Sequence, residues 1–345
     1  MGEGPANGHG GGDSRRTFST LTADVKALIR DRYGLPDVLE VRDVERPVPG
    51  DGEVLIRVHA ASINDWDWGL LQGPTLPFLR TPPKPILGSD VAGRVAALGN
   101  GVKRLQVGDD VYGDLSRFGG GGWGGFAEYV CAPERALALK PARMTFEQAA
   151  ALPQAGQLAV QGLRAGGPLE AGQKILINGG GGGVGTIGVQ IAKAHGVEVT
   201  GVDSAAKFEM MRAAGFDHLI DYKTEDFTRN GRRYDLIVDT KTNRWPWAYL
   251  DSLNRGGTYA TVGGPEMRHL FSVLLLGAPI RMMTGKSVRL VALKPNRDLA
   301  YLNERFDAGQ LMPILDGPFP LSEGANAMRR FGSADHLGKI IITMA

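Results

Sequence analysis

Six of the seven residues from 179 to 185 are glycine, and the flanking segments make this run the strongest constraint on the fold. A short apolar segment, Lys174–Asn178, precedes it, and a stretch with helical periodicity, Val184–His195, follows it. The run contains the spacing G-x-G-x-x-G, which is weak evidence alone but strong between a strand and a helix. The alternative is a flexible glycine linker, which periodic apolar segments on both sides disfavour.

Each glycine of this spacing is required for a different physical reason. Gly180 permits a tight turn, Gly182 lets backbone amides approach a pyrophosphate, and Gly185 lets the helix pack on the strand. Together with Gly181, Gly183 and Val184, these residues form the predicted binding loop of a dinucleotide cofactor.

Strand and helix patterns alternate on both sides of this loop. The predicted strands cover residues 174–178, 198–202, 218–222, 235–240 and 258–263, and the predicted helices 184–195, 205–214 and about 247–254. This order predicts βαβ units and a parallel, doubly wound sheet.

The remaining chain has a different pattern. Short apolar runs broken by Gly and Pro over residues 23–145 predict a β-rich barrel or sandwich, and Thr145 with Gln148 predicts a helix capping box. The apolar stretch Leu270–Met283 is too short to span a bilayer and contains Arg281, so we expect a buried helix near a pocket or subunit contact. After residue 294 we expect a helix, an extended segment at 311–320, a helix at 323–331 and a strand at 339–343. Residues 1–22 are predicted to be a disordered leader.

Charge and cysteine content narrow the class of partner. The net charge is +2 without basic runs, which favours a small-molecule partner over nucleic acid. The single cysteine, Cys131, excludes an intramolecular disulfide and a Cys-rich zinc site. A reducing compartment, the cytoplasm, fits this composition best.

The residue that reads the adenosine ribose is expected at the end of the second strand of the sheet. Asp203 lies there, and a carboxylate that binds two ribose hydroxyls while repelling a 2′-phosphate favours NAD. Ser204 and Lys207 favour NADP, because a hydroxyl and an ammonium in the same turn can hold a phosphate. A solvated helix face explains Lys207 equally well, so the choice between NAD and NADP stays open.

Several further motifs make the chain resemble the medium-chain dehydrogenase/reductase superfamily. They include Asn178–Gly185, Leu87-Gly88-Ser89-Asp90-Val91-Ala92-Gly93, Gly108-Asp109-Asp110-Val111 and Gly125-Phe126-Ala127-Glu128-Tyr129-Val130. Within the superfamily the chain is most similar to the zinc-free quinone oxidoreductases, the zeta-crystallin-like branch, over about residues 24–345.

This resemblance implies an α/β fold with two domains. A GroES-like β-rich catalytic domain would comprise residues 23–147 and 295–345, and a Rossmann dinucleotide-binding domain residues 148–294. The cofactor would lie between them, and the protein would be a homodimer or homotetramer.

Zinc-dependent relatives place a Cys in the stretch that is Ser62-Ile63-Asn64 here and a His at the position of Ser89. Neither ligand is present, nor is the four-cysteine structural lobe, and the six histidines show no ligand spacing. We therefore expect no zinc.

The resemblance also implies site residues. Asn64 is the candidate catalytic donor near the nicotinamide, with a turn-forming role before Asp65 as the alternative, whereas Asp67 is expected to hold the loop. The other implied residues are Tyr222, Gly263, Gly264, Lys294 and Asn296 at the cofactor, and Trp66, Trp68 and Trp123 at the substrate. For Lys294 and Asn296 the alternative is a turn imposed by Pro295.

The expected activity is hydride transfer from NADPH or NADH to a quinone or an α,β-unsaturated carbonyl. The alternatives are a zinc-independent alcohol dehydrogenase and a nucleotide-binding structural or regulatory protein without turnover. Three departures from the family pattern keep them open: Gly69 where a Tyr or His could donate a proton, Leu158 in place of a Thr, and Lys241-Thr242 in place of Val-Gly.

Overall fold

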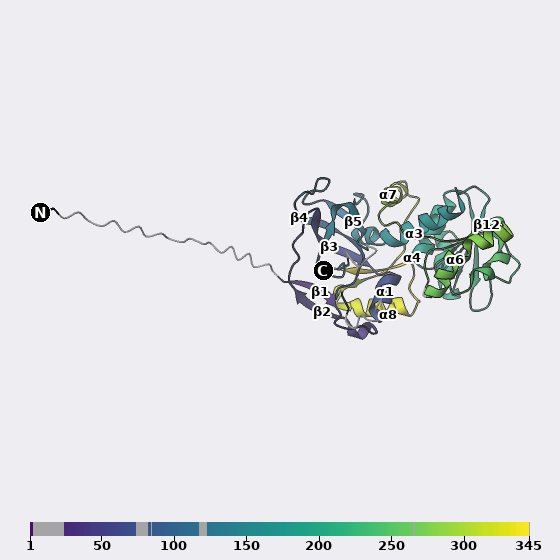
Figure 1. The fold of residues 1–345 in the computed structure, drawn as a ribbon, viewed down its shortest axis with the longest axis horizontal. Helices are drawn as coiled ribbons and strands as arrows, with labels where there is room; N and C mark the ends of the chain where they lie inside the picture. The colour runs from purple at the N-terminus through teal and green to yellow at the C-terminus, as the bar shows by residue number, and fades with distance from the viewer. Residues whose placement is uncertain (3–23, 74–81, 84, 117–122, 265, 345) are drawn as a thin grey trace.

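The computed structural model describes residues 1–2, 24–73, 82–83, 85–116, 123–264 and 266–344. Two units lie side by side, one built from both ends of the chain and one from its middle (Figure 1). Residues 3–22 of the predicted leader and the four glycines at 119–122 lie outside the described residues. The exact domain boundaries at 147/148 and 294/295 stay a prediction.

The first unit is a sheet of seven strands that combines the two ends of the chain. Its order is β14-β15-β3-β4-β5-β7, with β6 also paired to β3. The strands are β3 (Glu53–Ser62), β4 (Asp90–Leu98), β5 (Asp110–Asp114), β6 (Tyr129–Pro133), β7 (Ala138–Leu139), β14 (Leu315–Pro320) and β15 (Lys339–Thr343), and a separate hairpin joins β1 (Val25–Ile29) to β2 (Glu40–Val44). Strand β15 runs antiparallel to β3 and pairs Ile341 with Ser62, so the end of the chain borders the segment that carries Asn64.

The second unit is a six-stranded parallel sheet in the order β10-β9-β8-β11-β12-β13. Its strands are β8 (Lys174–Asn178), β9 (Glu198–Asp203), β10 (His218–Asp221), β11 (Tyr234–Asp239), β12 (Leu253–Thr261) and β13 (Ser287–Leu290). The order reverses between β8 and β11, which is where doubly wound sheets bind ligands. This confirms the predicted parallel sheet.

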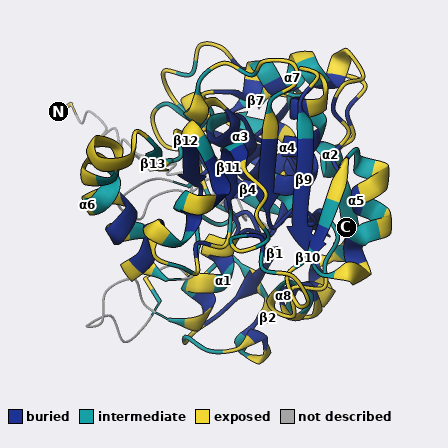
Figure 2. Cartoon of the chain, turned by 90° about the vertical axis from the view of Figure 1, so that its right-hand side faces the viewer, coloured by how far each residue is buried: buried dark blue, intermediate teal, exposed yellow. Residues whose placement is uncertain are grey.

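Side chains of β8 alternate between two hydrophobic cores, as a buried strand requires. Ile175 and Ile177 belong to the core that includes α3 and α4, whereas Leu176 belongs to the opposite core with Tyr249 and Val273. Figure 2 shows the buried strands of this sheet between helices. The helices are α1 (Asp65–Gln72), α2 (Phe146–Ala150), α3 (Pro153–Leu163), α4 (Gly183–Lys193), α5 (Phe208–Ala214), α6 (Met267–Thr284), α7 (Leu299–Asp307) and α8 (Gly324–Gly332).

The capping box at α2 is confirmed. The Gln148 backbone N–H donates to Thr145 Oγ1 at 3.2 Å, and the Thr145 N–H donates to Gln148 Oε1 at 2.9 Å.

Helix α6 forms where expected, but the prediction that it is buried is wrong. His269, Ser272 and Val273 are buried, whereas the apolar side chains of Phe271, Leu274, Leu275, Met282 and Met283 are exposed. The helix packs against β13, the edge strand of the sheet, so only one of its sides is covered (Figure 2). No helix in the described ranges is long and apolar enough to cross a membrane.

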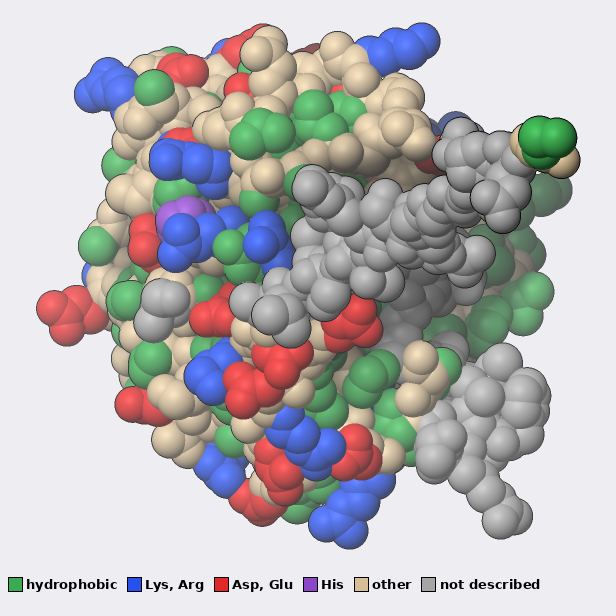
Figure 3. All heavy atoms as spheres, turned by 90° about the vertical axis from the view of Figure 1, so that its left-hand side faces the viewer, with side chains coloured by type: hydrophobic (Ala, Val, Ile, Leu, Met, Phe, Trp, Pro, Cys, Tyr) green, Lys and Arg blue, Asp and Glu red, His purple; other side chains and the backbone are tan. Residues whose placement is uncertain are grey.

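Figure 3 shows one face of the β-rich unit, on which acidic and basic side chains are intermixed. Among the described residues that this view shows, no broad basic patch of the kind that nucleic acid requires is seen.

Candidate active site

The glycine loop lies at the reversal of strand order, between β8 and the start of α4. A Cβ on Gly185 would collide with the carbonyl oxygen of Gly180, so only glycine allows this helix to approach the strand. A Cβ on Gly182 would meet nothing closer than 3.6 Å, so the backbone there is open to an approaching group. Both observations agree with the roles predicted for these glycines.

Backbone amides at the start of α4 are available to an anion. The amides of Gly179 and Gly180 both donate to Val202 O, at 2.9 and 3.0 Å. Across the described chain, those of Gly183, Val184 and Gly185 have no acceptor. Free N–H groups at the N-terminus of an eleven-residue helix fit a pyrophosphate.

Asp203 ends β9 as expected, but its carboxylate is already occupied by protein groups. Its Oδ2 accepts from the Gly181 N–H at 2.9 Å, and its Oδ1 accepts from the Ser204 N–H at 2.9 Å. Lys207 Nζ lies 3.5 Å from Oδ1, and both side chains are buried. Burial lowers the pKa of Lys207, which the charge of Asp203 partly offsets. The negative charge of Asp203 is therefore compensated within the protein.

The start of strand β15 connects the glycine loop to the first, β-rich unit. The Gly338 N–H donates to Gly181 O at 2.9 Å, and Gly182 forms a parallel bridge with Gly338. The next residue, Lys339, passes its side chain so close to Gly183 that a Cβ there would collide with it. The cofactor loop and the Asn64 segment are thus joined through two adjacent residues.

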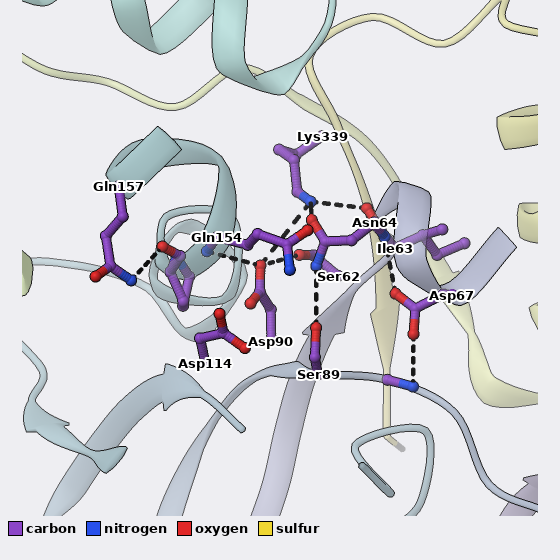
Figure 4. Close-up of polar contacts among 12 residues, drawn as sticks. Ser62, Ile63, Asn64, Asp67, Ser89, Asp90, Asp114, Gln154, Gln157 and Lys339 are labelled. Carbon is purple, nitrogen blue, oxygen red and sulfur yellow. Dashed lines mark hydrogen bonds and ion pairs between the residues drawn. The ribbon is translucent and has the colours of Figure 1, made fainter. Parts of the chain in front are cut away.

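Lys339 determines the orientation of the Asn64 side-chain amide (Figure 4). Its Nζ donates to Asn64 Oδ1 at 2.6 Å and to the Ile63 carbonyl at 2.7 Å. Because an ammonium can only donate, the Asn64 atom that faces it must be the oxygen. The Asn64 Nδ2 points to Ser89 Oγ at 3.3 Å, and hydrogen bonding from the same amide to the Asp90 carboxyl lowers the pKa of Asp90, against the larger effect of burial. Asn64 is therefore held as a hydrogen-bond donor.

Asp67 holds the loop between β3 and α1 to the loop before β4. Its Oδ2 accepts from the Asn64 N–H and its Oδ1 from the Gly88 N–H, both at 2.8 Å. Burial raises the pKa of Asp67 to about 7, although the two amides act in the opposite direction. This geometry agrees with the structural role expected for Asp67.

Two further carboxyl groups are buried beside Asn64. Asp90 is fully buried and its Oδ2 lies 4.0 Å from Lys339 Nζ. Asp114 is nearly as deeply buried, and burial raises its pKa to about 7. Burial also raises the pKa of Asp90, while it lowers that of Lys339. The site thus places one ammonium among several carboxyl groups.

The other expected cofactor residues lie at the ends of sheet strands or at the domain junction. Tyr222 is exposed directly after β10, and the Gly263 carbonyl accepts from Thr242 Oγ1 at 2.6 Å, next to Gly264. Lys294 is exposed. Asn296 has φ of 61°, donates from Nδ2 to Asp114 O and accepts from the Asp114 N–H, each at 2.8 Å. The Asn296 side-chain amide thus holds the segment after β13 to the end of β5.

The tryptophans expected at the substrate differ in their surroundings. Trp66 is exposed on α1, and Trp123 is half-buried. Trp68 packs against Phe331 of α8, with ring centroids 6.3 Å apart, and Gly332 has no room for a Cβ beside it. Trp68 therefore joins two helices.

Sequence reasoning missed the roles of Lys339 and Asp114, and gave Asp90 no role of its own. The available signal was a lysine at the start of a buried Ile-Ile-Ile strand, where a charge is costly without a partner. Within the described residues, no group of three His, Cys, Asp or Glu side chains has the arrangement of a metal site.

Two protein-family profiles match the chain. Residues 50–142 match the alcohol dehydrogenase GroES-like domain, and residues 214–342 match the zinc-binding dehydrogenase family.

Curated relatives and solved structures agree with these profiles. A chloroplastic quinone-oxidoreductase of Triphysaria versicolor is 32% identical over 92% of this chain and 98% of its own. An NADPH-dependent alkenal/one oxidoreductase of Arabidopsis thaliana, also chloroplastic, is 32% identical over 94% of this chain and 81% of its own. The solved quinone oxidoreductase of Coxiella burnetii is 27% identical, covers 94% of this chain and all of its own, and has a TM-score of 0.78. The chain belongs to the medium-chain dehydrogenase/reductase superfamily of oxidoreductases, with quinone oxidoreductases and enone reductases among its relatives.

Proposed function

We propose that the protein is an NAD(P)H-dependent, zinc-independent reductase of quinones or α,β-unsaturated carbonyls. The observation that carries the proposal is the orientation of the Asn64 side-chain amide, which Lys339 of β15 fixes as a donor. The residue before Lys339, Gly338, donates to Gly181 of the glycine loop. A neutral amide donor suits an acceptor that is already electrophilic and needs only its oxygen polarised.

The residues present fit a nicotinamide dinucleotide. The free amides of Gly183, Val184 and Gly185 would hold its pyrophosphate, and the open face at Gly182 would admit it. When bound, the reduced cofactor supplies the hydride. Asn64 Nδ2 would then donate to the carbonyl or quinone oxygen as negative charge develops there.

The experiment is a panel assay of the full-length protein. We expect NADPH or NADH oxidation with quinones and enones, and no reduction of NAD(P)⁺ with simple alcohols. Turnover of alcohols instead would support the alcohol dehydrogenase alternative, which a solved NAD-dependent alcohol dehydrogenase with a TM-score of 0.79 and 26% identity favours. Tight cofactor binding without turnover would support a non-catalytic role.

Asn64→Ala tests the donor. We expect kcat to fall about 100-fold, since a single oxyanion donor contributes at this order, with little change in cofactor affinity. An equal loss in both quantities would contradict the proposed role.

We propose NADPH as the preferred donor. Asp203 is compensated by Lys207 and by two backbone amides, so its repulsion of a 2′-phosphate is weakened. Lys207→Met should therefore raise the KM for NADPH more than that for NADH. Equal effects on both would contradict this preference.

We further propose a homodimer or homotetramer in the cytoplasm. The exposed apolar side of α6 and the edge strand β13 support self-association. The single cysteine fits a reducing compartment, whereas the two curated relatives described above are chloroplastic. Fluorescent tagging in the source cells would test the location.

A further inference from the structure

Asp90 and Asp114 lie opposite each other beneath Asn64 and have no part in the proposed hydride transfer. They are direct partners in the antiparallel pairing of β4 with β5, so their side chains leave the same face of the sheet. Both side chains are buried, and Figure 4 shows the two carboxyl groups next to each other.

Each carboxyl group has one hydrogen-bonded oxygen and one buried oxygen without a partner. Asp90 Oδ2 accepts from Ser62 Oγ and from the Gln154 N–H, both at 3.2 Å, and Asp114 Oδ1 accepts from the Ser116 N–H at 2.7 Å. Asp90 Oδ1 and Asp114 Oδ2 have no donor within the described part of the chain. Two carboxylates cannot bond to each other, but one proton between them makes one a donor and the other an acceptor.

The charges around Asp90 and Asp114 also favour one bound proton on the pair. Lys339 of β15 faces Asp90. Helix α1 contributes Asp67, whose negative charge repels those of Asp90 and Asp114, and Asp65, whose negative charge attracts the Lys339 ammonium. Helix α3 contributes uncharged groups, the Gln154 backbone N–H and the buried Gln154 side-chain amide, whose Nε2 has no partner among the described residues, and the Asn64 amide hydrogen-bonds to Asp90. With both carboxyl groups ionised, the pair carries two negative charges against one ammonium. One proton leaves a single charge, which Lys339 balances.

We propose that Asp90 and Asp114 share one proton and that this acid pair is a positioning element that keeps the Lys339 ammonium on Asn64. The step is the binding or release of that proton to solvent, and no other bond changes. Release doubles the negative charge of the pair. Lys339 Nζ is then drawn from Asn64 Oδ1 towards Asp90 Oδ2, 4.0 Å away, and Asn64 loses the contact that orients its amide.

The proton can be observed without any activity. We would label the Asp carboxyl carbons of the full-length protein with carbon-13, assign Asp90 and Asp114 through Asp90→Asn and Asp114→Asn, and titrate from about pH 5 to 9. We expect the two signals to move together, with a step above the ordinary range of Asp, and the Asn64 side-chain amide signal to shift over the same range. Two independent titrations near the ordinary value would overturn the shared proton.

The consequence for turnover rests on the proposed function. We expect kcat of the wild type to fall by up to about tenfold per pH unit above the ionisation of the pair. Asp114→Asn imitates the protonated pair, because its amide can donate to Asp90 Oδ1, so the alkaline fall should disappear. Asp110→Asn is the matched control in the same strand, since Asp110 pairs with Arg94 at 2.8 Å away from the site, and it should keep the wild-type profile.

The outcomes separate the two proposals. A joint titration with a kcat that does not follow it would overturn the positioning role. An absence of turnover with every acceptor would overturn the proposed function, and the carbon-13 titration would still decide whether the proton is shared.

Discussion

Lys339 shows how one side chain can serve both halves of the site. Its stem passes Gly183, and its ammonium donates to Asn64 and Ile63. Lys339→Met keeps most of the stem and removes the ammonium. We expect kcat to fall at least about tenfold with little change in cofactor affinity, and the free energy of unfolding to fall by about 3 kcal/mol, because Asp90 loses its counter-charge.

Steady-state kinetics, dinucleotide titration and urea denaturation measure these three effects. Lys174→Met is the control, since Lys174 is exposed and lies 4.0 Å from Glu198, and it should change none of them appreciably. A loss of cofactor affinity as large as the loss of kcat would show that Lys339 acts on the glycine loop instead.

The buried carboxyl groups predict how stability depends on pH. Asp67 and Asp114 have their pKa raised to about 7 by burial, so the folded state binds protons that the unfolded state has released at that pH. Stability from these groups is therefore present below their unfolded pKa and is lost as pH rises towards 7. We expect the free energy of unfolding to fall by on the order of 1 kcal/mol per pH unit between about pH 5 and 7.

Urea denaturation at several pH values measures this slope. Asp114→Asn should flatten it in part, and Asp110→Asn should leave it unchanged. Burial lowers the pKa of His336 to about 4, which acts in the opposite direction over this range, so the test is the difference between the wild type and Asp114→Asn. Equal slopes for the two proteins would contradict the raised pKa of Asp114.

At the scale of elements, the sequence predicted most strands and helices because apolar periodicity is local. Apolar runs predict the strands at 174–178 and 339–343, and the spacing of Thr145 and Gln148 predicts the capping box, all of which the structure confirms. The contact between Lys339 and Asn64 spans 275 residues, so no local pattern could show it. The burial of α6 was mispredicted because a sequence does not show that its helix covers a sheet edge.

Helix α1 contains a glycine that local physics disfavours. Gly69 is exposed within the helix, and a Cβ there would meet nothing within 4 Å among the described residues. We expect Gly69→Ala to raise the free energy of unfolding by about 0.5–1 kcal/mol, through helix propensity and a less flexible unfolded chain.

Gly215→Ala is the matched comparison, since Gly215 ends α5 with φ of 108°. It should lower stability, because alanine disfavours that conformation. Thermal and urea unfolding measure both variants. A destabilised Gly69→Ala would mean that α1 needs glycine there for a reason beyond its own helix.

At the scale of the whole molecule, the exposed apolar side of α6 is the feature that a monomer explains least. Leu275, Met282 and Met283 are 73%, 88% and 85% exposed on a helix that flanks the open sheet edge. Contiguous apolar surface of this kind marks association sites. We expect the wild type to sediment as a dimer or tetramer of its 36.8 kDa chain, and Leu275→Glu combined with Met282→Glu to sediment as a monomer with unchanged circular dichroism.

Val48→Glu, at an equally exposed apolar residue of the β-rich unit, should leave the assembly intact. A wild type that is monomeric at about 100 μM, far above the Kd of a stable assembly, would contradict the proposal, as would a double variant with the wild-type mass.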